Sequence, residues 1–138
     1  MNKTRILVID DNIAATRIVK LSLERTGRYE VCELNNPFEA LPVTREFKPD
    51  LILLDVSMPG IEGGDVAFRI HSEKEFERTP IVFLTALVSP VEAKGTGMLV
   101  GGFHFVAKPP RLEQMIACIE DHLERVRSSD EPCTIKES

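Results

Sequence analysis

Five short apolar runs alternate along the chain with segments whose apolar residues recur at helical spacing. The runs Arg5 to Ile9 and Leu51 to Val56 are almost continuously apolar, which is typical of parallel strands covered on both faces. The other three are Tyr29 to Leu34, Pro80 to Ala86 and Phe103 to Ala107. Strands that alternate with helices need crossover connections, which are nearly always right-handed. The sequence therefore predicts an α/β domain with a parallel sheet and helices on both faces.

The first and last helical segments have the clearest spacing. In the first, Ala14, Ile18 and Leu21 share one face, and Gly27 is placed to end the helix. The apolar residues of the last segment follow i, i+3, i+4, i+7 spacing; they are Leu112, Met115, Ile116, Ile119, Leu123 and Val126. We expect this final helix to dock on the sheet.

Two other helical segments are less regular. Asn36 and Pro37 provide an N-cap and a first helical residue for the second helix, but Pro42 then removes a backbone donor, so this helix is kinked or begins late. The fourth helix has a capping-box start at Ser89 and Glu92. It is then interrupted by glycines, which makes it short or pliable; they are Gly95, Gly97, Gly101 and Gly102.

Composition and charge narrow the class of protein. The 138 residues suffice for one domain, which we expect to span residues 1–127, followed by a disordered polar tail at residues 128–138. A net charge of −5 opposes direct binding to nucleic acid. No stretch suits a signal peptide or approaches the roughly 20 apolar residues of a membrane helix. We therefore expect a cytoplasmic protein.

The three cysteines, Cys32, Cys118 and Cys133, lack the spacing of a disulfide framework or a zinc site.

Acidic, hydroxyl and basic side chains that could bind a metal or a phosphoryl group lie at the carboxyl ends of four of the five predicted strands. These residues are Asp10 and Asp11, Asp55, Thr85, and Lys108. In an open parallel sheet, ligands bind outside the carboxyl ends of the strands, so these side chains are expected to converge. Three crowded carboxylates repel one another unless a hard cation compensates them, and oxygen ligands favour Mg²⁺, with Mn²⁺ as an alternative. The Lys108 ammonium and the Thr85 hydroxyl suit phosphoryl oxygens, which indicates phosphoryl transfer to Asp55.

Each of these residues also has an ordinary structural interpretation. Asp11 with Asn12 could cap the first helix, and Asp55 could be a turn acid before the Met-Pro-Gly turn. Thr85 could be a common strand residue, and Lys108 could be solvated. Their coincidence at four strand ends is what favours a functional site.

The motifs resemble those of the receiver domains of two-component response regulators, over residues 4–127. The matching segments are ILVIDD (Ile6 to Asp11), LILLDVSMPGIEG (Leu51 to Gly63), LTA (Leu84 to Ala86) and AKP (Ala107 to Pro109). The resemblance implies a flavodoxin-like fold, with a doubly wound five-stranded sheet of order 2-1-3-4-5 and five helices. It implies a phosphoacceptor that takes a phosphoryl group from a sensor histidine kinase or a histidine phosphotransfer protein, and that catalyses only its own phosphorylation and dephosphorylation.

The resemblance also assigns roles to residues. Asp55 would be the phosphoacceptor, with Thr85 and Lys108 holding the phosphoryl oxygens. Asp11, Asp55 and the backbone carbonyl of Ser57 would ligate Mg²⁺, with Asp10 acting largely through water. Thr85 and Phe105 would change the conformation of the output surface. The domain would then signal by contact with a downstream protein or by passing the phosphoryl group onward. No further cofactor is implied.

Three alternatives remain at this stage. In the first, the chain is a receiver excised from a hybrid kinase or a longer regulator, with the tail as its linker. In the second, it is a degenerate receiver used only for binding; the presence of all the acids and of Lys108 argues against this. In the third, it is a haloacid-dehalogenase-like phosphatase, a class disfavoured because Ser57 stands where that family has a second Asp.

Overall fold

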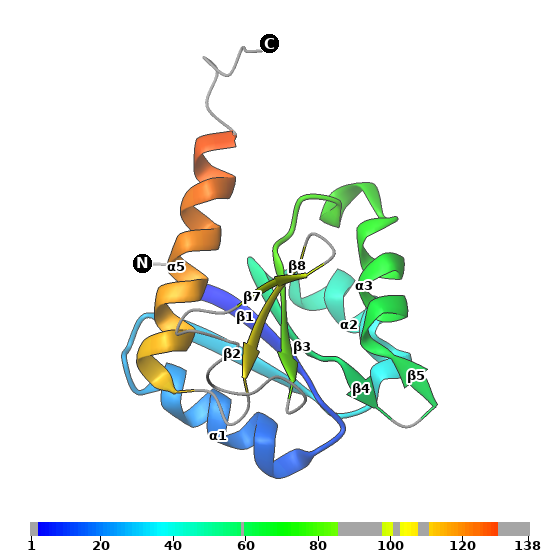
Figure 1. The fold of residues 1–138 in the computed structure, drawn as a ribbon, viewed down its shortest axis with the longest axis horizontal. Coiled ribbons are helices and arrows are strands. Elements are labelled where there is room, and N and C mark those ends of the chain that lie inside the picture. The colour runs from blue at the N-terminus through cyan, green and yellow to red at the C-terminus, as the bar shows by residue number, and fades with distance from the viewer. Residues whose placement is uncertain (1–2, 59, 86–97, 101–102, 108–110, 130–138) are drawn as a thin grey trace.

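The computed structural model describes residues 3–58, 60–85, 98–100, 103–107 and 111–129 (Figure 1). One twisted sheet forms the centre of the molecule. Its parallel strands are, in spatial order, β2 (Tyr29–Leu34), β1 (Thr4–Ile9), β3 (Leu51–Asp55), β6 (Ile81–Thr85) and β8 (Phe103–Ala107). This confirms the predicted order 2-1-3-4-5 and places each strand within one or two residues of its predicted bounds.

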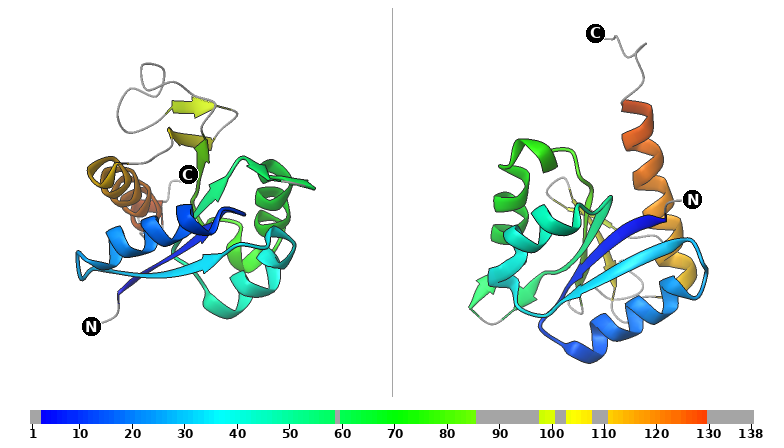
Figure 2. Two further views of the ribbon diagram at one scale, coloured as in Figure 1. Left: turned by 90° about the horizontal axis from the view of Figure 1, so that it is seen from below. Right: turned by 180° about the vertical axis from the view of Figure 1, so that it is seen from behind.

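Of the helices that the structure describes, two cover each face of the sheet (Figure 2). On one face lie α1 (Ile13–Glu24) and α5 (Leu112–Ser129), and on the other lie α2 (Ala40–Phe47) and α3 (Gly63–His71). Successive side chains of a strand point to opposite faces, so Ile6 and Val8 join the core beneath α1 and α5. Leu7 and Ile9 join the second core, beneath α2 and α3. Burial on both faces explains why this strand is apolar throughout.

The first helix is present as predicted, but the face named in the sequence analysis is not its buried face. Ile18 and Leu21 are 60% and 54% exposed, and Ala14 is also exposed. The helix packs on the sheet through its opposite side, where Thr16, Val19 and Leu23 are buried. Gly27, with a φ of +80°, follows the helix as expected. The result is a helix with an apolar surface turned to solvent.

The second helix begins late, as its proline suggested. Pro37–Glu39 form a short 3₁₀ turn, η1, which Asn36 caps by accepting a hydrogen bond from the Phe38 N–H at 3.1 Å. The α-helix starts only at Ala40, so Pro42 falls in its first turn, where backbone N–H groups have no intrahelical acceptor. A second 3₁₀ turn, η2 (Lys74–Phe76), follows α3.

The sheet carries an additional strand that differs from the predicted fourth helix. Residues Met98–Val100 form β7, which pairs antiparallel with β8 at the edge of the sheet. The predicted helix start at Ser89 lies outside the described residues. Between Met98 and Ala107 two apolar runs flank Gly101 and Gly102, a pattern that favours a hairpin over a helix. Residues 98–100 are therefore a strand and not a continuation of the predicted fourth helix.

A small antiparallel ribbon follows the central strand. It consists of β4 (Ser57–Met58) and β5 (Ile61–Glu62), and Gly60 between them has a φ of +82°. This is the turn that the Met-Pro-Gly sequence indicated.

The last described helix, α5, continues to Ser129, two residues beyond the predicted end of the domain. Cys32 and Cys118 are free thiols. None of the described helices is both long and apolar enough to cross a membrane.

Candidate functional site

Three carboxylates meet at the carboxyl ends of β1 and β3. Asp10 and Asp11 directly follow β1, and Asp55 is the last residue of β3. One oxygen from each carboxylate lies within 4.8 Å of the other two. Asp10 and Asp55 are only 1% and 7% exposed, whereas Asp11 lies at the surface. The structure thus brings together the three acids that the sequence predicted to converge.

Backbone hydrogen bonds hold Asp10 in place. Its N–H donates to the carbonyl of Leu34 in β2 at 3.0 Å, and its Oδ1 accepts from the Asn12 N–H at 3.0 Å. Asn12 is the N-cap of α1, because its Oδ1 accepts the Ala15 N–H at 3.1 Å. The capping function therefore belongs to Asn12, and the carboxylate of Asp11 remains available to a ligand.

Gly63, the first residue of α3, packs directly against the backbone at Asp55. Its N–H donates to the carbonyl of Val56 at 2.8 Å. A Cβ at this position would lie 2.5 Å from the Asp55 carbonyl oxygen, closer than real Cβ contacts occur. Only glycine therefore allows α3 to start this close to the end of β3. Gly63 ends the segment LILLDVSMPGIEG, but no sequence pattern indicates this close backbone contact.

The strand register places the remaining predicted residues by their backbones. Asp55 lies opposite Leu84 in the β3–β6 pair, so Thr85 is one residue further along β6. Thr85 lies opposite Ala107, the residue before Lys108. Ser57 opens β4, two residues after Asp55. Lys108 itself and the side chain of Thr85 lie outside what the structure describes.

Phe105, the predicted partner of Thr85 in the switch, lies in the middle of β8. Phe105 stands opposite Phe83 in the β6–β8 pair and opposite Met98 in the β7–β8 pair. The structure describes its backbone and not its side chain. Ala86 and Pro109, which end two of the segments that resemble the family, lie outside the described residues. The switch assigned to Thr85 and Phe105 therefore stays a prediction.

The three acids suit a hard divalent cation. Like charges this close disfavour the ionised state unless a positive charge compensates them. All three side chains offer oxygen ligands, and two approach from the buried side while Asp11 faces solvent. Mg²⁺ prefers oxygen ligands, uses one or two carboxylates and keeps several waters. The donor set fits Mg²⁺, with Mn²⁺ as the closest substitute.

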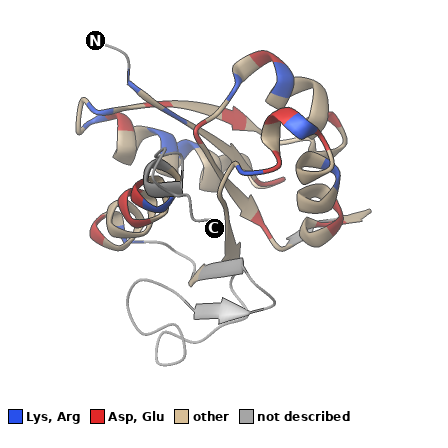
Figure 3. Ribbon diagram, turned by 90° about the horizontal axis from the view of Figure 1, so that it is seen from above, with Lys and Arg blue, Asp and Glu red and all other residues tan. Residues whose placement is uncertain are grey.

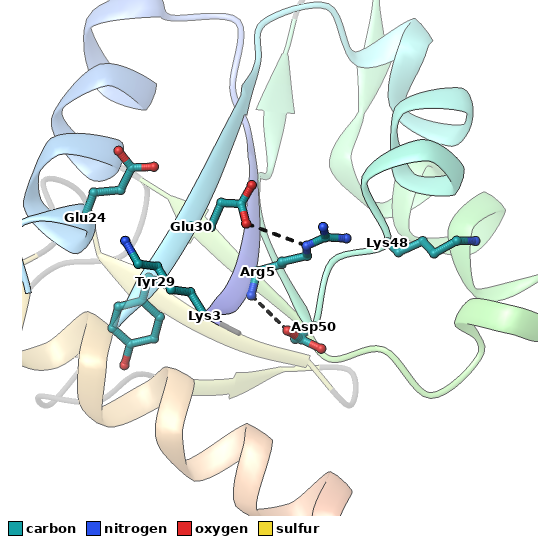
Figure 4. A pocket seen from close by; sticks show the side chains of 7 residues that line it. All are labelled: Lys3, Arg5, Glu24, Tyr29, Glu30, Lys48 and Asp50. Carbon is teal, nitrogen blue, oxygen red and sulfur yellow. Dashed lines mark hydrogen bonds and ion pairs between the residues drawn. The ribbon is translucent and has the colours of Figure 1, made fainter. Parts of the chain in front are cut away.

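A separate hollow lies at the opposite end of the strands (Figure 4). It encloses about 880 Å³ and is lined by Lys3, Arg5, Glu24, Tyr29, Glu30, Lys48 and Asp50. Its charges are matched: the Arg5 guanidinium pairs with Glu30 at 3.7 Å, and the Arg5 N–H donates to the Asp50 carboxylate at 2.8 Å. This hollow therefore shows no preference for a ligand of either sign. The acid cluster at the carboxyl ends of the strands is therefore the better candidate for a functional site.

Comparison with known proteins identifies the family. A family model for the response regulator receiver domain matches residues 6–120, and the protein belongs to this family. The chain is 35% identical over 131 residues to the transcriptional regulatory protein YvrH of Bacillus subtilis strain 168, covering 95% of this chain and 54% of YvrH. It is 31% identical over 130 residues to the DNA-binding response regulator MtrA of Mycolicibacterium paratuberculosis, covering 94% and 55%.

A solved structure agrees with this assignment. The chemotaxis protein CheY4 of Vibrio cholerae superposes with a TM-score of 0.73 at 28% identity, covering 87% of this chain and 98% of CheY4. Receiver domains are phosphoacceptor signalling domains that interact with histidine kinases and bind Mg²⁺ at an acidic pocket. The chain spans about half the length of the curated relatives it matches.

Proposed function

We propose that Asp55 is the phosphoacceptor of this receiver domain, with Mg²⁺ held by Asp10, Asp11, Asp55 and the backbone carbonyl of Ser57. The convergence of the three carboxylates within 4.8 Å of one another carries this proposal. Asp55 is the nucleophile among them because it ends the central strand, is 7% exposed, and has its backbone fixed by α3. Asp10 is more deeply buried and already accepts the Asn12 N–H, which suits a supporting role.

The reaction is a phosphoryl transfer from a phosphohistidine. An Asp55 carboxylate oxygen attacks phosphorus, the P–N bond breaks, and the histidine nitrogen keeps the electron pair. The product is an acyl phosphate on Asp55. When bound, Mg²⁺ neutralises charge on the acids and on the phosphoryl oxygens. Thr85 and Lys108 follow neighbouring strands and would hold those oxygens, and Phe105 would report the change to the output surface.

The donor would dock on the exposed apolar face of α1. Ile13, Ile18 and Leu21 are 63%, 60% and 54% exposed, which is unusual for three large apolar side chains on one short helix. Two exposed arginines lie on or beside this helix: Arg17, which pairs with Glu33 at 3.0 Å, and Arg25, which is the C-cap residue. Ile13 lies only two residues after Asp11, so a protein seated here would reach the acid site. A helical donor with apolar side chains and carboxylates matches this surface.

Small-molecule phosphorylation tests the acceptor. Incubation with acetyl phosphate and Mg²⁺ should add one phosphoryl group to the wild type by intact mass. The Asp55→Asn variant should gain none. Asp65→Asn is the matched control, because it removes an exposed carboxylate from the first turn of α3 without touching the acid cluster. Phosphorylation of the Asp55→Asn variant at the wild-type level would refute the assignment.

A protein donor tests the docking face separately. Ile18→Glu places a charge on the exposed apolar face of α1, and Phe68→Glu does the same at a 74% exposed position on α3. The first variant should slow transfer from a phosphorylated histidine phosphotransfer protein at least tenfold, and the second should not. Both should accept phosphate from acetyl phosphate at the wild-type rate. Equal protein-to-protein transfer in both variants would exclude α1 as the docking face.

The output is proposed to be protein contact or onward phosphoryl transfer. In the view of Figure 3, Lys and Arg lie among Asp and Glu along the described ribbon, which does not favour a phosphate-binding stripe. MtrA is named as DNA-binding, and this chain matches about half of it. We propose that residues 1–127 form the receiver unit, whether it acts alone or within a longer regulator, with residues 128–138 as its tail or linker.

A further inference from the structure

We infer that Asn35 and Thr16 are positioning residues that hold the Asp10–Asp11 turn in the geometry that binds the metal. This inference rests on the proposed function, because it assigns a role toward the same acid cluster. Neither residue belongs to a motif, and neither carries a charge. Both come from elements beside β1: Asn35 follows β2, and Thr16 lies in α1.

Asn35 holds the backbone of Asp10 directly. Its Nδ2 donates to the Asp10 carbonyl at 2.8 Å and to Thr16 Oγ1 at 3.0 Å. A carbonyl only accepts hydrogen bonds, so the orientation of the Asn35 amide is fixed, and both of its N–H groups are used. The Asp10 carbonyl belongs to the peptide group that joins Asp10 to Asp11. A hydrogen bond at this atom therefore restrains both neighbouring carboxylates.

Thr16 holds Asn35 in turn. Its side chain is fully buried, and its Oγ1 accepts from Asn35 while lying 3.0 Å from Glu33 Oε1 and 3.1 Å from the Ile13 carbonyl. A hydroxyl has one proton, and the charged Glu33 carboxylate is the stronger acceptor. Glu33 Oε2 accepts from Arg17 Nε at 3.0 Å. A continuous set of polar contacts thus runs from the exposed face of α1 to the backbone of Asp10.

This arrangement restrains the acid turn from several directions. The Asp10 N–H is held by β2, its carbonyl by Asn35, and its Oδ1 by the Asn12 N–H. Groups that orient metal ligands from outside the coordination sphere commonly contribute tenfold or more to metal affinity. Loss of the Asn35 contact would free the turn to move away from its neighbours, because three like charges repel one another.

A buried threonine elsewhere provides a comparison. Thr44 in α2 is also fully buried, but its Oγ1 has no hydrogen-bond partner among the described residues. Burial alone therefore does not bring a threonine hydroxyl its partners in this protein. Thr16 and Thr44 lie in helices on opposite faces of the sheet, so the same substitution at both separates positioning from packing.

Magnesium titration tests the inference. Binding of Mg²⁺ alone is followed by the amide chemical shifts of Asp11 and Asp55, and urea unfolding without Mg²⁺ reports stability. Thr16→Val and Asn35→Ala should raise the Mg²⁺ dissociation constant about tenfold. Thr16→Ser retains the hydroxyl and should bind close to wild type. Thr44→Val should bind as the wild type does.

Each outcome has a distinct meaning. A tenfold loss in Thr16→Val that Thr16→Ser restores supports the inference, since a packing defect alone would not depend on the hydroxyl. Wild-type Mg²⁺ affinity in Thr16→Val or Asn35→Ala, whatever their stability, overturns it while leaving the proposed function intact. A wild-type protein that binds no Mg²⁺ overturns the metal site itself.

Discussion

Gly63 lies against Asp55 so closely that a Cβ on Gly63 would stand 2.5 Å from the Asp55 carbonyl oxygen. The start of α3 and the end of the central strand are therefore in backbone contact. This contact fixes the peptide group of the proposed phosphoacceptor. It also makes the site sensitive to one methyl group.

Gly63→Ala should destabilise the protein by about 1–3 kcal/mol, the usual cost of forcing extra volume into a packed region. It should also slow phosphorylation, because α3 or the Asp55 backbone must shift. Gly64→Ala is the control: its Cβ would meet nothing within 4 Å, and alanine favours the helix by about 0.5–1 kcal/mol. Urea unfolding of both variants provides the measurement. Equal stability of the two would show that the close approach is relaxed in solution.

Repulsion within the acid cluster predicts opposite effects of Asp11→Asn with and without metal. Without Mg²⁺ the variant should be more stable than the wild type, because one of three crowded charges is removed. Added Mg²⁺ should stabilise the wild type by about 1.4 kcal/mol for each tenfold excess over its dissociation constant, and the variant less. Thermal unfolding across a Mg²⁺ series measures both effects. Asp65→Asn should keep the wild-type response, and an equal Mg²⁺ gain in Asp11→Asn would contradict a role for Asp11.

A hydrogen bond between Tyr29 and Glu120 predicts a stability change at alkaline pH. Tyr29 is 1% exposed and its hydroxyl donates to Glu120 Oε2 at 2.5 Å, which joins β2 to α5. Burial, together with the Glu120 carboxylate, raises the pKa of Tyr29 to about 12 from its usual value of 10.0. The folded state thus favours the protonated phenol. This stabilisation is complete below pH 10 and is lost as the pH rises through 12.

Tyr29→Phe removes both the hydrogen bond and this titration. At pH 8 the variant should be less stable by about 1–2 kcal/mol. As the pH rises from 10 towards 12 the wild type should lose the stability that comes from this group, so the difference between the two proteins should shrink. Urea unfolding at pH 8, 10 and 11 follows the trend. A difference that stays constant across this range would contradict the raised pKa.

Burial also predicts a slow thiol at Cys118. Its side chain is 4% exposed, and burial raises its pKa to about 11 from 9.0, with Asp121 adding to the effect. The thiolate is the reactive form, so iodoacetamide at pH 8 should modify Cys118 much more slowly in the native protein than in urea. Mass spectrometry of the peptides resolves each cysteine. Rapid native modification of Cys118 would show that this part of α5 opens readily.

The sequence predicted the strands and the acid cluster because both are local signals joined by one topological rule. The runs containing Ile6 and Leu53 are apolar on both faces, which marks buried parallel strands. The carboxyl ends of parallel strands lie on the same side of the sheet, so Asp10 and Asp55 were expected to meet there. No distance information was needed for this step.

Features that depend on tertiary contacts were missed. The spacing of Ile18 and Leu21 showed a helix face but not which face the sheet would cover. The role of Asn35 follows from the pairing of β1 with β2, which brings the end of β2 to Asp10. The role of Gly63 follows from how closely α3 approaches β3. For residues 98–100, a glycine pair between apolar runs was the overlooked hairpin signal.

The most direct test of the central claim is the location of the phosphoryl group after treatment of the wild type with acetyl phosphate and Mg²⁺. Rapid proteolysis at acidic pH and tandem mass spectrometry assign the modified residue. We predict a single modification, on Asp55, that is absent when Mg²⁺ is chelated. A phosphoryl group on any other residue, or one on Asp55 that forms equally well without a divalent cation, would contradict the account.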